Sequence, residues 1–191
     1  MTAVVESVRV PFRAAICAVF ALMAGCGIQF SNLDPATRMS GEEGDAVVVL
    51  AVRPRSRVSL FEGEGEGEEW TCKSSFNIAN VFPEGGFIVL KLKPRVGSKN
   101  YGIGQVLPDG IGGQRFIVRR DAMIPAFHAP AGKVTFVGGI LLARRRGYVT
   151  VAPDEATTVE DAERFLRSTY PGLGGGVDQD PLVFLRADGG C

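Results

Sequence analysis

Short apolar segments recur about every ten residues between positions 46 and 153, and this spacing constrains the fold more than any other feature of the chain. Glycine, proline, asparagine or aspartate separates most of them. Leu90 and Leu92 alternate with Lys91 and Lys93, as on a strand that has one buried face. Many short strands at this spacing are typical of two antiparallel sheets packed face to face.

The apolar content of each segment indicates how it sits in such a sandwich. The segment 46–53 is apolar on nearly every position of both faces, which indicates a central strand. Gly138-Gly139 interrupts the apolar run 133–143 and indicates a bulge or bend, while 182–185 is a candidate last strand at a sheet edge. The remaining strands are expected at 57–62, 68–82, 87–94, 101–107, 115–120, 124–129 and 148–153.

One helix is expected near the C-terminus. Thr157 followed by Glu160 fits a capping box, and Pro171 ends the helical pattern. The apolar stripe at helical spacing consists of Val159, Ala162, Phe165 and Leu166. The expected fold class is therefore mainly β: an antiparallel β-sandwich, immunoglobulin-like or transthyretin-like, with one amphipathic helix packed against the sheet or closing one end.

The N-terminal residues follow a different pattern. Arg9 and Arg13 precede an uncharged apolar run at 14–23, which ends at small residues and a cysteine. Ten residues make about 15 Å of helix, roughly half of a bilayer core, so this run is too short to span a membrane. A basic start, a short apolar middle and small residues at the end are typical of a secretory signal peptide.

The stretch Leu22-Met23-Ala24-Gly25-Cys26 resembles the lipobox of bacterial lipoproteins. In that family the signal peptide is cleaved before the cysteine, whose sulfur is then diacylated. The resemblance therefore implies export, lipidation of Cys26 and a membrane anchored by acyl chains such as palmitate. Gly27 stands where an aspartate often retains such proteins in the inner membrane, so the resemblance implies the outer membrane in a diderm host.

Three regions follow: a signal peptide at 1–25, a flexible tether at 26–45 and a β-sandwich domain at 46–191. The tether is expected because small, polar and charged residues are mixed there without periodicity. The segment APAGKVTFVG at 129–138 resembles a hairpin of uncharacterised bacterial lipoproteins that have a sandwich core. That resemblance implies a β-sandwich and supplies no catalytic residues.

Charge and motif content argue against several activities. Removing Glu6, Arg9 and Arg13 with the leader from 21 acidic and 21 basic residues leaves 20 and 19, and a net charge of −1 gives no general attraction to nucleic acid. His128 is the only histidine, so a histidine-rich metal site is excluded, and a catalytic triad would need His128 as its base. We expect His128 to be a partly exposed structural residue, and we expect no cofactor, no metal and no catalytic residue.

The run EGEGEGEE at 62–69 is unusual. Its carboxylates could offer oxygen ligands to a hard cation such as Ca²⁺, but the alternating glycines raise the entropic cost of ordering them. A solvated, mobile hairpin loop is the favoured interpretation.

Cys72 and Cys191 remain once Cys17 leaves with the leader and Cys26 is lipidated. Export would allow a disulfide between them, because disulfides persist in oxidising compartments. The alternative is that Cys191, which follows Ala-Asp-Gly-Gly, lies in a disordered segment.

The expected function is that of a membrane-anchored extracytoplasmic lipoprotein, which acts as a binding or structural module of the cell envelope. Besides the membrane, its expected partner is an envelope protein or polymer. One alternative is an accessory subunit of an envelope secretion or transport complex, which an exposed apolar patch would favour. The other is a hydrolase, which would require a nucleophile or convergent acids around His128 in a deep pocket.

Overall fold

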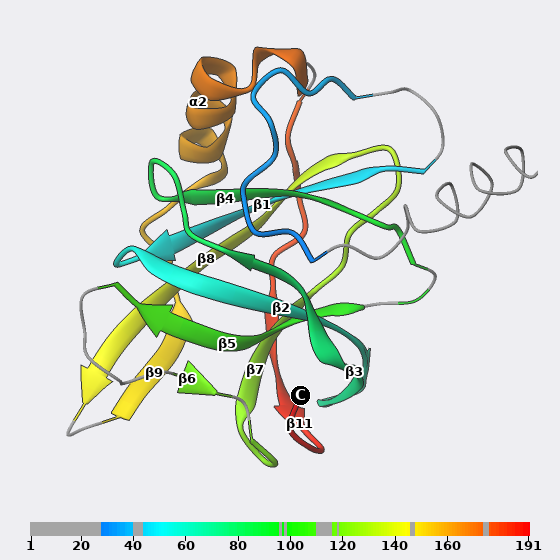
Figure 1. Ribbon diagram of the computed structural model, residues 1–191, viewed down its shortest axis with the longest axis vertical. Coiled ribbons are helices and arrows are strands. Elements are labelled where there is room, and N and C mark those ends of the chain that lie inside the picture. The colour runs from blue at the N-terminus through cyan, green and yellow to red at the C-terminus, as the bar shows by residue number, and fades with distance from the viewer. Residues whose placement is uncertain are drawn as a thin grey trace, which may run out of the picture.

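The protein is mainly β, and its strands form two sheets with one helix near the C-terminus (Figure 1). This computed structural model describes residues 28–39, 44–95, 97, 99–109, 116–117, 119–145, 148–173 and 176–191. The expected signal peptide and Cys26 lie outside the described residues. The mainly β class and the helix that the sequence predicts are both confirmed.

The first sheet has five strands in the order β10-β8-β1-β4, and β9 pairs with β8 off this path. Its strands are β1 (Ala46–Arg53), β4 (Phe87–Leu92), β8 (Val134–Arg145), β9 (Tyr148–Pro153) and β10 (Asp178–Gln179). β1 lies between β4 and β8 and is buried on both faces, so the prediction of a central strand is confirmed. The expected bulge is also present: the β1–β8 register shifts beside Gly138, which has a φ of 91°.

The second sheet has six strands in the order β2-β3-β11-β7-β5-β6. Its strands are β2 (Ser56–Glu66), β3 (Glu69–Val81), β5 (Tyr101–Pro108), β6 (Phe116–Ile117), β7 (Met123–Phe127) and β11 (Val183–Ala187). β2 also pairs with β5, so five of these strands close into a ring and β6 lies outside it. β11 lies between β3 and β7, so the expectation of an edge strand at 182–185 is wrong.

Both sheets are mixed, which corrects the expectation of a purely antiparallel sandwich of the immunoglobulin or transthyretin kind. β1 and β10 each run parallel to β8, and β11 runs parallel to β3. Parallel neighbours must be joined by long connections, and about 80 residues of chain separate β1 from β8. The near-continuous apolar run of β1 fits its burial on both faces, with β8 parallel and β4 antiparallel beside it.

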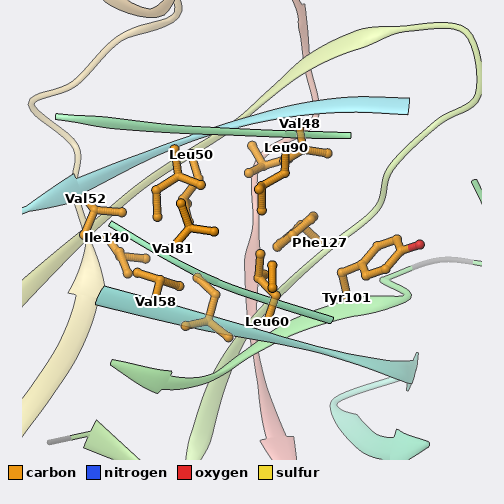
Figure 2. Close-up of a cluster of buried hydrophobic side chains, with 14 of the residues drawn as sticks. Val48, Leu50, Val52, Val58, Leu60, Val81, Leu90, Tyr101, Phe127 and Ile140 are labelled. Carbon is orange, nitrogen blue, oxygen red and sulfur yellow. The ribbon is translucent and has the colours of Figure 1, made fainter. Parts of the chain in front are cut away.

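The main core lies between the two sheets. Figure 2 shows side chains of β1 and β4 meeting those of β2, β3 and β5 across it, including Leu50, Leu90 and Leu60. The other face of the five-stranded sheet packs against α2 through Val47, Val49 and neighbouring apolar residues. The order of layers is therefore helix, five-stranded sheet, six-stranded sheet, and Figure 1 shows α2 on the far side of β1 and β4 from β2.

The N-cap of helix α2 (Val159–Thr169) lies one residue later than the sequence predicts. Thr158 is the N-cap residue, and its side chain accepts a hydrogen bond from the Asp161 backbone N–H while the Asp161 carboxylate accepts one from the Thr158 N–H. The capping box therefore uses Thr158 and Asp161 instead of Thr157 and Glu160, because the Thr157 hydroxyl donates to Asp154.

The described residues of the expected tether are hydrogen-bonded to the β domain. Between positions 28 and 39 the chain runs along the edges of both sheets, where Gln29 forms a parallel bridge with Ala79 of β3. The Leu33 N–H donates to the Val89 carbonyl of β4 at 2.8 Å, and the Asn32 side-chain oxygen accepts from the Val89 N–H at 2.9 Å. These contacts cover the exposed edge of β4, which corrects the expectation of a flexible tether over 28–39.

Candidate functional site

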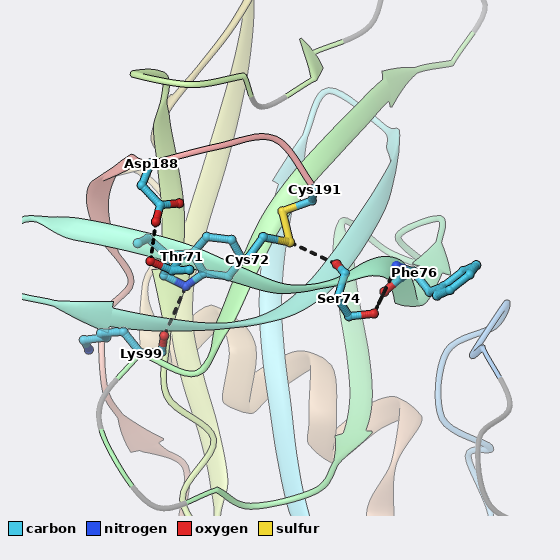
Figure 3. Close-up of a disulfide and its surroundings, with 8 residues drawn as sticks. Thr71, Cys72, Ser74, Phe76, Lys99, Asp188 and Cys191 are labelled. Atoms are coloured by element: carbon cyan, nitrogen blue, oxygen red, sulfur yellow. Dashed lines mark hydrogen bonds between the residues drawn. A yellow bond between two sulfur atoms is a disulfide. The ribbon is translucent and has the colours of Figure 1, made fainter.

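Cys72 and Cys191, the two cysteines that export would allow to pair, are joined in a disulfide in this structure (Figure 3). Cys72 lies on β3, and the two Cα atoms are 5.6 Å apart although 119 positions separate them in the chain. The pairing fastens the segment after β11 to β3. The alternative of a disordered Cys191 does not hold.

Two further contacts fix the same segment. The Thr71 hydroxyl donates to the Asp188 carboxylate at 2.6 Å, and the Asp188 N–H donates to the Trp70 carbonyl at 3.2 Å. The Trp70 indole N–H donates to the Lys99 carbonyl at 3.2 Å, so the strand that carries Cys72 is itself held on its inner side (Figure 3).

The run EGEGEGEE does not form a mobile loop. Residues 62–66 belong to β2, and the chain turns at Gly67 and Glu68 before β3 begins. The glycines of β2 face the interior of the ring: a Cβ on Gly63 would lie 2.0 Å from Cζ2 of Trp70. The alternation of glutamate and glycine therefore matches the alternation of side chains along a strand, with the glycines facing inward and the carboxylates outward.

Two of the carboxylates on this strand, Glu62 and Glu64, are paired with bases. Lys73 Nζ lies 2.8 Å from a Glu64 oxygen, and its hydrogen bond lowers the pKa of Glu64. Arg95 reaches Glu62 at 2.5 Å. Among the described residues, no group of three or more histidine, cysteine, aspartate or glutamate side chains is arranged to hold a metal ion.

His128 lies just after β7 and is about one-third exposed. Its Nδ1 is 3.8 Å from Asp180, which pairs with Lys99 at 3.1 Å on its other oxygen. In the part of the chain that the structure describes, no serine, threonine or cysteine side chain hydrogen-bonds to His128. The partial exposure of His128 matches the expectation from the sequence.

A groove with a volume of about 520 Å³ lies between α2 and the end of the five-stranded sheet. Leu166, Tyr170 and Leu173 form its apolar wall, and Arg167 and Glu163 also line it. The Tyr170 hydroxyl is buried and has no hydrogen-bond partner among the described residues, and burial raises its pKa to about 12. The sequence predicts the helix but not this groove, because 171–177 carries no periodic pattern.

An exposed apolar surface lies where the described chain begins, on the outer side of β3. We call it the Phe76 face, and it consists of Ile28, Phe30, Phe76, Phe82 and Arg57. Phe76 and Phe30 are 76% and 69% exposed, the highest values among the large apolar side chains described. In Figure 3 the Phe76 ring points away from the disulfide. Sequence reasoning missed this face because it assigned Ile28 and Phe30 to a tether.

No helix in the described part of the chain is long and apolar enough to cross a membrane. Comparison with family models, with curated proteins and with solved structures found no match to this chain.

Proposed function

We propose that this protein is an exported lipoprotein, anchored at Cys26, whose β domain is a binding or structural module of the cell envelope. The lipobox-like stretch that ends at Cys26 carries the proposal. With Gly27 in the next position, we assign the anchored protein to the outer membrane if its host is diderm.

The paired cysteines support export. Disulfides form and persist in secreted and periplasmic proteins and are rare in the reducing cytosol, so the Cys72–Cys191 pair fits an extracytoplasmic domain. The path of the chain supports the anchor as well: Ile28 lies at the surface of the domain, where an attached lipid could leave it without crossing the core. A lipid with two or more chains is a stable attachment, since each buried CH₂ contributes about 0.8 kcal/mol.

Labelling with radioactive palmitate in a bacterial host tests this proposal. The full chain should incorporate label, and Cys26→Ser should lose it. Cys17→Ser is the matched control, because it removes a cysteine nine positions earlier and should leave the labelling unchanged. Equal labelling of the full chain and Cys26→Ser would contradict the proposal.

A further inference from the structure

We propose that the Phe76 face rests on the bilayer that holds the anchor, with its aromatic rings in the interfacial region and Arg57 at the lipid headgroups. This inference rests on the proposed lipidation of Cys26 and goes further, because it gives the domain a fixed orientation and makes the membrane surface a direct partner of its β3 strand.

Strand geometry places these side chains on one face. Gln29 and Ala79 are bridged, and Ala79 points into the core between the sheets. The register between β2 and β3 is irregular beside Ala79, and Ile78 is partly buried against the core between the sheets. Phe76 on β3 is exposed, and so are Ile28 and Phe30 on either side of Gln29. Val58 pairs with Val81, which puts Arg57 opposite Phe82 on the same outer side.

Three large apolar side chains of the face are exposed to solvent. Phe76 and Phe30 expose most of their surface, and Ile28 is 38% exposed. Exposed apolar side chains that gather on one side of a domain mark a candidate site of interaction with a protein or a membrane. Aromatic side chains at the edge of a domain suit the interface between headgroups and acyl chains.

The short chain between Cys26 and this face indicates that the membrane, and not another partner, covers the face. Cys26 and Ile28 are two Cα–Cα steps apart, so their Cα atoms are separated by at most about 7.6 Å. Ile28 belongs to the segment that is hydrogen-bonded to β3 through Gln29, whose N–H donates to the Ile78 carbonyl at 2.9 Å. A lipid on Cys26 therefore cannot hold the Phe76 face far from the headgroups.

One cation of the Phe76 face, Arg57, is suited to an anionic lipid surface. The other basic residues in the stretches that build and flank the face, 28–33, 53–61 and 73–82, are ion-paired: Arg53 with Asp154, Arg55 with Asp109 and Lys73 with Glu64. The guanidinium of Arg57 lies 4.6 Å from the centre of the Phe82 ring, and no described acidic residue forms an ion pair with it. An unpaired guanidinium beside exposed rings is suited to phosphate groups of lipids.

Fluorescence quenching in vesicles tests this orientation. The lipidated full chain, with Phe76→Trp, is purified and reconstituted into phosphatidylethanolamine and phosphatidylglycerol vesicles that carry brominated acyl chains. The native Trp70 is buried at 1% exposure and supplies a constant background. The matched control is Ser168→Trp, an exposed position on α2 that two sheets separate from the Phe76 face.

The account predicts that Phe76→Trp loses most of its added emission to brominated lipid, while Ser168→Trp keeps it. If mass spectrometry shows that the protein is lipidated but brominated lipid quenches Phe76→Trp no more than Ser168→Trp, the inference is overturned and the proposed anchor stays intact. Protection of Phe76→Trp from aqueous iodide without quenching by brominated lipid would also overturn it, because a second copy or another protein would then cover the face. A protein without lipid on Cys26 would overturn the proposed function itself.

Discussion

At the residue scale, glycines determine how the ring of strands is filled. A Cβ on Gly102 would lie 2.8 Å from the Trp70 indole, and one on Gly104 would lie 2.6 Å from the Phe61 ring. Trp70 is almost wholly buried, so the backbones of β2 and β5 must approach its ring closely. Glycine is the one residue that allows this approach without a clash.

Gly63→Ala tests this account of the ring. The new methyl group would overlap the Trp70 ring, and overpacking of this kind costs about 1 to 3 kcal/mol of unfolding free energy. Denaturant melts should show that loss, and Gly44→Ala, where nothing lies within 4 Å of the new Cβ, should show much less. Adding Trp70→Phe to Gly63→Ala should make the two changes cost less than their sum. Equal stability of Gly63→Ala and Gly44→Ala would show that Trp70 does not fill the ring as described.

At the element scale, the alternation of side chains predicts strands well but predicts their neighbours poorly. β4 shows the first point, since Leu90 is buried between the sheets and Lys91 is exposed, as the sequence indicates. β1 and β8 show the second, because pairing between segments about 80 residues apart leaves no local signal. The prediction of a mobile loop at 62–69 is wrong for a related reason. The glycines of 62–66 face inward, Gly63 against the Trp70 ring of another strand, so this segment has no apolar alternation that would indicate a strand.

The register of β4 can be tested by one pair of variants. Leu90→Ala removes a side chain from the core between the sheets and should cost about 2 to 5 kcal/mol of unfolding free energy. Lys91→Ala removes a half-exposed ion pair with Asp45 and should cost about 1 kcal/mol or less. Chemical denaturation measures both, and the reverse order would mean that the register is wrong by one residue.

Asp154 joins three elements at the start of α2. Its carboxylate accepts hydrogen bonds from Arg53 at the end of β1 and from the Thr157 hydroxyl, and its side chain is only 2% exposed. The hydrogen bond from Arg53 is the main cause that lowers the pKa of Asp154. A lowered pKa stabilises the fold above the unfolded value near 3.9, and this stability is lost as the pH falls through the folded value.

Asp154→Asn should therefore destabilise the protein in a manner that depends on pH. At pH 7 the loss should be about 1 to 3 kcal/mol, because hydrogen bonds to a buried charge are removed; Arg53 is half exposed, so solvent screens the charge attraction itself. The difference between the parent protein and the variant should stay constant from pH 7 to about pH 5 and shrink below that, as the pH falls through the lowered folded pKa of Asp154. Thermal melts over this range measure it, and a difference that does not change with pH would contradict the ionised pair.

At the scale of the whole molecule, the domain has two distinct sides. The helix α2 and its groove lie on one side, and the Phe76 face lies on the other, two sheets away. The segment that follows Cys26 runs along the edges of both sheets, and the disulfide ties the region after β11 to β3. The sequence predicts the anchor motif and allows the disulfide. It does not predict the Phe76 face, because that surface combines residues about 50 positions apart.

The mass of the tryptic peptide that carries Cys26 tests the central claim most directly. Trypsin cleaves after Arg13 and Arg38, and no lysine or arginine lies between them. From the protein purified from bacterial membranes, the account predicts a peptide that begins at Cys26, ends at Arg38 and carries the mass of a diacylglyceryl group on the cysteine. An unmodified peptide that spans 14–38, with Cys26 as a free thiol, would contradict it.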